Sequence, residues 1–311
     1  MPETQTRGPR FFPDLVLYHI IYRFFFLIGL ISPGLAARAA NAAGRIWFVL
    51  DRRHREIAVE NLTRAFGGQM SQAGIRSLAR RAFCNLVRII FEIGWSMHIT
   101  DEDIRKYFRF RGMENLRAAL HNKKGVLVFT AHIGNWELLP AAVGRIGYPI
   151  SATYRPLDFK PLDMFFRELR SRDGAELLPK KRAMRKVLGS LKKNKLVGMM
   201  LDQNARVFDG VFTDFFGEPA CTNKGLALLA RETGTPVVPI FLVREQGYFQ
   251  VECGRPLPRI KTGDKTKDIE ALTRLYNKVI EDIIRRYPDQ WFWVHKRWKT
   301  KPYKLWEPPV S

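Results

Sequence analysis

The hydrophobic positions of this chain follow two different periods. Short apolar runs rich in β-branched or aliphatic residues, typical of buried strands, lie at residues 126–130, 150–154, 196–201 and 237–243. Apolar residues at helical spacing predict helices at residues 36–66, 71–97, 161–172 and 268–286, with Gly67-Gly68 ending the first of them. Strands that alternate with helices in this way indicate an α/β protein.

Weaker patterns fill the intervals. Residues 107–112 alternate like an edge strand, and residues 248–253 fit a hairpin partner for the strand before them. Residues 211–220 are apolar but contain Gly217 and Pro219, so we expect an irregular loop there. We expect Thr222 to cap the helix that follows.

The segment Leu15–Ile31 is apolar and aromatic, and only His19 and Arg23 interrupt it. It is at the short edge of a membrane span, so a transmembrane helix and an interfacial helix both remain open. Arginines gather on its C-terminal side: Arg7 and Arg10 precede it, and Arg38, Arg45, Arg52, Arg53 and Arg55 follow. If the helix spans the membrane, this excess of arginine on its C-terminal side places the body of the protein in the cytoplasm. We expect residues 1–35 to be a tail and membrane-anchoring helix, and residues 36–311 one domain.

A histidine follows the first buried strand directly. His132 lies just past its carboxyl end, where open α/β sheets place their ligands. Gly134 permits a turn, Asn135 suits a helix N-cap, and Glu137 falls in the first turn of the next helix. On a continuous helix, residues five apart point about 140° away from each other. His132 and Glu137 therefore meet only if the chain bends at Gly134.

Such a pair can perform general-base catalysis. A carboxylate beside one imidazole nitrogen fixes the tautomer, and the other nitrogen then accepts a proton from a hydroxyl. Backbone N–H groups near Gly134 and Asn135 would stabilise an oxyanion. The spacing alone is weak, because a loop histidine and a first-turn glutamate favoured by the helix dipole would look the same.

Two further polar residues follow strands. Arg155, held extended by Pro156, ends the strand at residues 150–154, and Asp202 ends the strand at residues 196–201. Arg155 is most simply a surface residue, and Asp202 is either a helper of His132 or a turn cap. Phe215 and Phe216, in the expected loop, are candidates for the apolar wall of a ligand site.

The charge of the chain implies an anionic partner. The formal net charge is +22 at pH 7, which favours nucleic acid, an anionic bilayer, or a phosphorylated or carrier-bound substrate as the partner. One basic cluster is either a solvated face or a surface for an acidic protein or a bilayer. It comprises Lys180, Lys181, Arg182, Arg185, Lys186, Lys192, Lys193 and Lys195. The aromatic, basic residues 288–299 suggest interface anchoring, with His295 structural or substrate-positioning.

Several classes of function lack their motifs. The spacing of Cys84, Cys221 and Cys253 fits neither a metal site nor a disulfide framework, and weakly favours a reducing compartment. The chain has no phosphate-binding loop, no Gly-x-Ser-x-Gly elbow and no His-Glu-x-x-His sequence. ATP use, serine hydrolysis and zinc proteolysis are therefore disfavoured, and we expect no metal and no cofactor.

The order and spacing of several short motifs resemble a known family across most of the chain. They are the His132-x4-Glu137 turn, Phe215-x-Gly-x-Pro-Ala220, Thr233-Gly-x-Pro-Val-Val-Pro239 and Trp293-x-His-Lys-Arg-Trp-Lys299. These are similar to motifs of the bacterial lipid A late acyltransferases (lauroyl and myristoyl), within the His-x4-Asp/Glu acyltransferase superfamily. The resemblance implies an α/β, glycerolipid acyltransferase-like fold with a mostly parallel central sheet, flanking helices and an N-terminal membrane helix.

The resemblance also implies a reaction and a location. A fatty acyl chain would move from an acyl carrier protein or coenzyme A thioester to a hydroxyl of a lipid A precursor. His132 would be the base, supported by Glu137, with Gly134, Asn135 and Arg155 at the oxyanion. Arg155 would alternatively contact the acceptor phosphate or the thioester region, and Phe215 and Phe216 would line the site of the acyl chain. The basic cluster would bind the acidic face of an acyl carrier protein or the bilayer surface. The enzyme would lie at the bacterial inner membrane with its catalytic domain on the cytoplasmic side. Another glycolipid or lysophospholipid acceptor remains open, as does a non-enzymatic, basic, membrane-associated binding protein. The apolar N-terminus and the lack of nucleic-acid-binding motifs disfavour nucleic acid as a partner.

Overall fold

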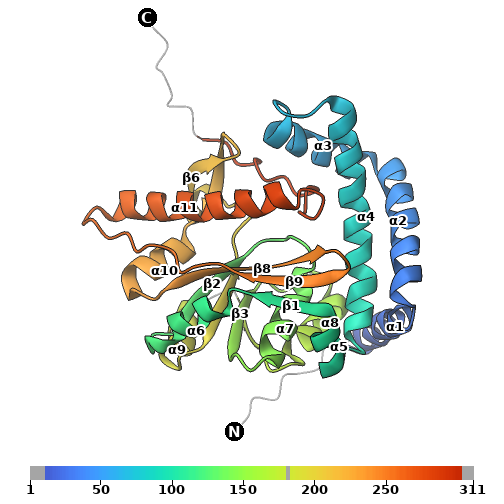
Figure 1. The fold of residues 1–311 in the computed structure, drawn as a ribbon, viewed down its shortest axis with the longest axis horizontal. Coiled ribbons are helices and arrows are strands. Elements are labelled where there is room, and N and C mark those ends of the chain that lie inside the picture. The colour runs from blue at the N-terminus through green and yellow to red at the C-terminus, as the bar shows by residue number, and fades with distance from the viewer. Residues whose placement is uncertain (1–10, 180–182, 303–311) are drawn as a thin grey trace, which may run out of the picture.

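A seven-stranded sheet forms the centre of the computed structural model, which describes residues 11–179 and 183–302 of the 311-residue chain (Figure 1). The strand order is β1-β9-β8-β2-β5-β3-β4, and every neighbouring pair is parallel except β8 and β9. The strands are β1 (Phe108–Arg111), β2 (Val126–Thr130), β3 (Ile150–Tyr154), β4 (Glu176–Pro179), β5 (Leu196–Met200), β8 (Val237–Glu245) and β9 (Tyr248–Cys253). The predicted mostly parallel α/β sheet is confirmed.

Helices cover both faces and one end of this sheet. They are α1 (Phe11–Gly29), α2 (Pro33–Leu50), α3 (Arg52–Phe66), α4 (Gln72–Ser96), α5 (Asp101–Tyr107), α6 (Met113–His121), α7 (Leu139–Arg145), α8 (Lys160–Ser171), α9 (Ala183–Lys192), α10 (Gly225–Thr233) and α11 (Lys265–Arg286). Figure 1 shows α11 across one face, α6 and α7 on the other, and α4 standing at one end with α2 outside it.

The side chains of β2 show why the sheet separates two cores. Leu127 and Phe129 point into the larger cluster, which includes α4 and α11, and Val126 and Val128 point into the smaller one beside α6 and α7. Successive strand residues face opposite sides, so a strand buried on both sides must be apolar at every position. This requirement explains the uninterrupted apolar run that precedes His132.

The N-terminal helix α1 packs on α4 and α8 but leaves most of its surface exposed. Phe25 stacks on Phe165 of α8 at 4.5 Å, and a Cβ on Gly29 would lie 2.2 Å from the carbonyl oxygen of Gly94 in α4. Residues 12–29 are long and apolar enough to cross a membrane by length and composition, and only 11% of them are buried.

The continuous helix predicted for residues 36–66 is wrong, because the chain breaks at Asp51. Helix α2 ends at Leu50 and α3 begins at Arg52. The Asp51 carboxylate accepts a hydrogen bond from the backbone N–H of His54 at 3.1 Å and so caps α3. An aspartate inside an apolar pattern was the sequence feature that marked this break.

The irregular loop predicted for residues 211–220 is also wrong. Strands β6 (Gly210–Phe215) and β7 (Glu218–Asn223) form an antiparallel hairpin. Phe216 and Gly217 join them with φ angles of 57° and 78°, the positive values that a two-residue hairpin turn of the primed type needs. Thr222 lies in β7 and caps no helix; its hydroxyl hydrogen-bonds to Asn277.

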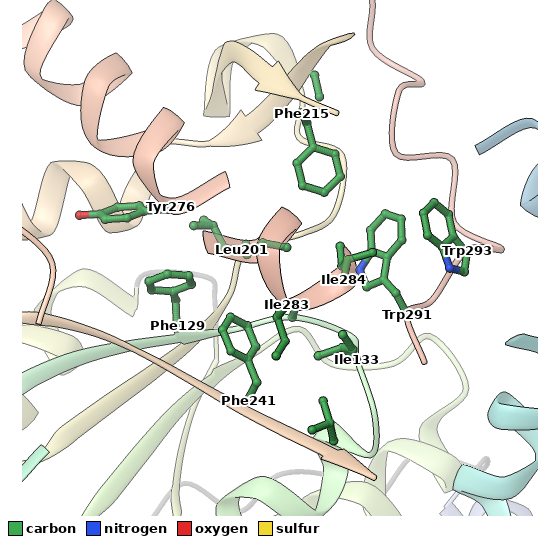
Figure 2. Packing of buried hydrophobic residues seen from close by; sticks show 14 of the residues in the cluster. Phe129, Ile133, Leu201, Phe215, Phe241, Tyr276, Ile283, Ile284, Trp291 and Trp293 are labelled. Carbon is green, nitrogen blue, oxygen red and sulfur yellow. The ribbon is translucent and has the colours of Figure 1, made fainter. Parts of the chain in front are cut away.

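The aromatic tail is core, which contradicts the expected interface anchoring. Trp291, Trp293 and Trp298 are exposed by only 1%, 0% and 5%. Figure 2 shows Trp291 and Trp293 beside Ile284 within the buried cluster. Arg297 is fully buried, donates to the carbonyl oxygen of Cys221 at 2.9 Å and stacks over Phe215. The side chains of the tail are therefore part of the hydrophobic core and contribute to its packing.

Candidate active site

His132 and Asp202 lie together at the carboxyl edge of the sheet. They follow β2 and β5, which are parallel neighbours, so both residues leave the sheet at the same edge. The Nδ1 of His132 lies 2.8 Å from Oδ1 of Asp202, and the backbone N–H of His132 donates to Oδ2 at 2.9 Å. Asp202 is only 2% exposed.

Asp202 is held in its charged form. Burial alone raises the pKa of this carboxyl, but the neighbouring imidazole, the His132 N–H and the Trp291 indole outweigh burial and lower the pKa to about 2. The indole Nε1–H of Trp291 donates to Oδ2 of Asp202 at 2.7 Å. An ionised, buried carboxylate with no arginine of its own is suited to stabilise a positive imidazole.

The tautomer of His132 follows from this geometry. Because ionised Asp202 is only an acceptor, Nδ1 of the neutral imidazole carries the proton and donates it. Nε2 is then the acceptor, and the side-chain amide of Gln203 lies 3.3 Å from it. The His132 side chain is 18% exposed. A ligand hydroxyl that replaces this long amide contact would meet a basic nitrogen.

The tail fixes the turn that carries His132. The N–H of Phe292 donates to the carbonyl oxygen of His132 at 3.0 Å, and Ile133 forms a β-bridge with Trp291. The imidazole also contacts the rings of Trp136 and Phe292, with centroids 5.0 and 5.9 Å away. Segments far apart in sequence thus meet at one imidazole.

Glu137 does not support His132 in this structure. Its two carboxylate oxygens accept hydrogen bonds from Arg170 of α8, both at 2.7 Å, and Oε1 also accepts from the indole of Trp136 at 3.0 Å. Although burial lowers the pKa of Arg170, the charge of Glu137 outweighs it and raises that pKa. The imidazole partner expected from the His-x4-Glu spacing is therefore Asp202, and Glu137 instead ties the turn to α8.

Gly134 has a different role from the predicted bend toward Glu137. Its φ is 61°, and a Cβ there would lie 1.9 Å from the carbonyl oxygen of Leu242 in β8. Its N–H donates to the carbonyl oxygen of Gln290 at 3.0 Å. The glycine therefore permits close packing of the turn on β8 and the tail, and its N–H is occupied.

Asn135 precedes the short helical turn Trp136–Leu138, as predicted, but its side chain caps nothing. The amide donates to Glu92 of α4 at 2.9 Å, and Oδ1 is buried with no partner among the residues described. Glu92 is in turn bound by Arg244. The N–H of Asn135 has no acceptor within residues 11–179 and 183–302.

The remaining predicted site residues are dispersed. Arg155 follows β3 at the same edge as His132, and its side chain is 79% exposed. Phe215 and Phe216 are 0% and 7% exposed and pack against the tail tryptophans, so their rings offer no open wall to a ligand. His295 lies in the tail, and burial lowers its pKa to about 4.

The basic cluster is partly described. Lys180, Lys181 and Arg182 lie outside the described residues. Lys195 pairs with Glu176 at 2.9 Å. Arg185, Lys186, Lys192 and Lys193 are exposed and have no ion-pair partner in the described chain. No group of three or more potential metal ligands occurs among the residues described.

Comparison with known proteins identifies the family of the chain. The family model for bacterial lipid A biosynthesis acyltransferases matches residues 10–300. A lipid A biosynthesis palmitoleoyltransferase of Escherichia coli K12 is 29% identical over 252 residues, covering 81% of this chain and 80% of the relative. A lauroyltransferase from the same organism is 28% identical, covering 85% of each. A phosphatidylinositol mannoside acyltransferase of Mycobacterium tuberculosis is 29% identical, covering 60% of this chain and 58% of that protein.

Proposed function

The chain belongs to the bacterial lipid A biosynthesis acyltransferase family and is an O-acyltransferase, and on this premise we propose that it acylates a hydroxyl of a lipid A precursor. The acyl chain comes from a thioester of acyl carrier protein or coenzyme A. The observation that carries the proposal is the 2.8 Å contact between His132 and buried Asp202, with Nε2 directed to a replaceable partner.

The reaction proceeds through His132 acting as a base. Nε2 takes the proton of the acceptor hydroxyl while that oxygen attacks the thioester carbonyl carbon. Asp202 stabilises the resulting imidazolium through Nδ1. The tetrahedral oxyanion then collapses, the C–S bond breaks, and the imidazolium returns the proton to the sulfur. No covalent acyl-enzyme is required.

The oxyanion needs donors that are not already used. The N–H of Gly134 is occupied by Gln290, which removes it from the original proposal. The N–H of Asn135 and the exposed guanidinium of Arg155 remain candidates, and Arg155 also suits a phosphate of the acceptor. An exposed cation at the same edge as the base suits contact with an anionic lipid.

The chemistry is tested with purified protein, labelled acyl carrier protein and a panel of acceptor lipids. His132→Ala is expected to abolish transfer, whereas His121→Ala, at the exposed end of α6, is expected to leave it unchanged. Retained transfer in His132→Ala, with native thermal unfolding, would contradict the assignment.

A second acceptor class has a specific observation in its favour. The similarity to a mannoside acyltransferase extends over 60% of the chain, so a mannolipid belongs in the same panel. We favour the lipid A precursor because the relatives with that chemistry match a larger share of both chains. Products identified by mass spectrometry decide between the two.

The start of helix α9 is proposed as the docking surface for an acyl carrier protein. Since β4 is parallel to its neighbours, α9 begins at the same edge of the sheet as His132, which places Arg185 and Lys186 there. Lys192 and Lys193 lie at the other end of α9 and provide a matched control. Reversing Arg185 and Lys186 to glutamate should raise KM for acyl carrier protein but not for acyl-CoA. An equal effect from reversing Lys192 and Lys193 would contradict this placement.

The proposed location is the cytoplasmic side of the bacterial inner membrane. The exposed apolar residues of α1 and α2 include Phe24 and Leu27, and Ile46, Val49 and Leu50. Arginines at positions 52, 53 and 55 follow the apolar end of α2 and suit anionic headgroups. Residues 1–35 would anchor the single domain formed by residues 36–311. Removal of residues 1–35 should weaken binding to vesicles that contain anionic lipid, while the exposed residues of α2 and the arginines after it retain part of that binding.

A further inference from the structure

A cavity lies at the opposite edge of the sheet from His132. It has a volume of about 380 Å³, at the low end of the range for small-ligand sites. Its walls come from the loops that precede β2 and β8, the segment after β9, and the inner face of α11. Lys124 and Pro236 line it, and these residues lie at the amino ends of the strands whose carboxyl ends meet the active site.

The two sites are separated by the length of the sheet. Strand β2 has 5 residues between the cavity and the histidine turn, and such a strand spans roughly 16 Å. None of His132, Asp202, Glu137 or Arg170 lines the cavity. A ligand held here is therefore distinct from the reacting groups.

The inner wall carries a polar atom that the protein leaves unsatisfied. Tyr276 of α11 is 1% exposed, and its hydroxyl is buried with no hydrogen-bond partner in the described residues. Figure 2 shows this hydroxyl pointing away from the labelled aromatic side chains. Burial raises the pKa of Tyr276, so the hydroxyl stays protonated and can donate. Leaving such a group unpaired costs on the order of 1–3 kcal/mol.

The outer part of the cavity carries two cations. Lys124 and Arg259 are exposed, and neither has an ion-pair partner in the part of the chain that the structure describes. Arg231, which also lines the cavity, is already bound by Asp268 at 2.8 Å. The cavity is also lined by the apolar side chains of Leu257, Ile260 and Leu272.

We propose that this cavity binds an elongated anion whose carboxylate or phosphate lies at Lys124 and Arg259, with an apolar body and a hydrogen-bonding group at Tyr276. This ligand chemistry matches the three kinds of residue that line the cavity: two exposed cations, several apolar side chains and one buried, unpartnered hydroxyl. A carboxylate and a phosphate share this head-group chemistry, and binding experiments separate them. The proposal does not depend on which acceptor the active site uses.

The test uses the full-length protein and small probes in isothermal calorimetry. We expect 8-hydroxyoctanoate to bind more tightly than octanoate, and 1,8-octanediol to bind at least tenfold more weakly than the hydroxy acid. Octyl phosphate binding more tightly than octanoate would identify phosphate as the preferred head group, and the reverse would identify carboxylate. Equal binding of the diol and the hydroxy acid would overturn the proposal.

Matched variants locate the binding. Tyr276→Phe keeps the ring and should remove the preference for 8-hydroxyoctanoate over octanoate, while Lys124→Met with Arg259→Met should weaken both acids at least tenfold. Lys261→Met removes an exposed charge next to the cavity-lining Ile260 and should change neither. His132→Ala should bind the probes normally, which separates this cavity from the active site. Unchanged binding in both the Tyr276 and the cation variants would overturn the proposal, whatever the result of the acyl-transfer assay.

Discussion

Two buried carboxylates lie near His132, and they differ in what satisfies them. Glu137 receives both of its short hydrogen bonds at 2.7 Å from one permanent cation, Arg170. Asp202 receives hydrogen bonds from an imidazole, an indole and a backbone N–H, and none from an arginine or lysine among residues 11–179 and 183–302. Asp202 can thus gain a full ion pair when His132 becomes charged, whereas the charge of Glu137 is already neutralised.

The difference shows that closeness in sequence is a poor guide to the carboxylate that contacts His132, the proposed base. Glu137 is five residues from His132 and binds another helix, whereas Asp202 is 70 residues away and binds the imidazole. Parallel neighbouring strands bring the distant carboxylate to the histidine. The comparison separates a group that acts on the imidazole from a positioning group.

The largest expected effect comes from Asp202→Asn. An asparagine amide would donate to Nδ1 and favour the wrong tautomer, so we expect kcat to fall by about 10³–10⁴-fold. Glu137→Gln, measured on the folded fraction, should lower kcat by a much smaller factor. The measurement is steady-state acyl transfer with folded protein quantified by circular dichroism. A larger loss in Glu137→Gln than in Asp202→Asn would reverse the assignment of the two carboxylates.

The Glu137–Arg170 pair should contribute to stability instead. Removing one partner of a largely buried ion pair leaves an uncompensated charge and costs about 3–5 kcal/mol. We expect Arg170→Gln to destabilise strongly, and the double variant with Glu137→Gln to be less destabilised than the two single changes added together. Urea unfolding of the four proteins measures the coupling. Coupling of Arg170 to Asp202 instead would contradict the structural comparison.

The sheet could be predicted from sequence because its signal is local. Residues 126–130 and 196–201 are apolar at almost every position, as strands buried on both faces must be. The hairpin of β6 and β7 was missed because Phe216 adopts a positive φ that its residue type does not suggest. The tail was assigned to the membrane interface because a Trp-rich, basic segment looks the same whether lipid or protein surrounds it.

The site was only partly predictable for the same reason. His132 and Asp202 could be recognised as strand-end residues, but which carboxylate meets the imidazole depends on strand order. Arg170 lies in an amphipathic helix with no distinguishing pattern. No sequence pattern predicts which group accepts a hydrogen bond from an indole N–H. Trp291 could therefore have been found only through its place in the tail.

A substitution at Trp291 would perturb Asp202 less than a change of Asp202 itself, because it removes only one of the hydrogen bonds to the carboxylate. Trp291→Phe keeps an aromatic ring but removes the N–H that donates to Asp202 at 2.7 Å. We expect kcat to fall about tenfold, which corresponds to the loss of one hydrogen bond to a charged group. Trp293→Phe is the matched control, because the Trp293 indole donates to the carbonyl oxygen of Pro288 instead. Equal losses in kcat for the two variants would indicate a general packing effect.

The smallest expected effect is on the pH dependence of the free energy of unfolding, to which Asp202 and His295 contribute at different pH values. Burial lowers the pKa of His295 from 6.5 to about 4, so the unfolded chain binds this proton first as the pH falls. The stabilising contribution is full above pH 6.5 and is lost as the pH falls toward 4, by roughly 1–3 kcal/mol. The pKa of Asp202 is lowered from 3.8 to about 2, so its contribution is present above pH 3.8 and is lost only below it.

The two pH windows do not overlap, so the two residues shape different parts of the pH profile. His295→Gln should flatten the unfolding free energy between pH 4 and 6.5. Asp202→Asn should flatten the limb below pH 3.8, and because the charge of Asp202 raises the His295 pKa, the same change should also lower that pKa further. Chemical unfolding at closely spaced pH values measures both slopes. A slope between pH 4 and 6.5 that survives in His295→Gln would mean that another group charges there, and that the buried tail histidine is not what limits stability in mild acid.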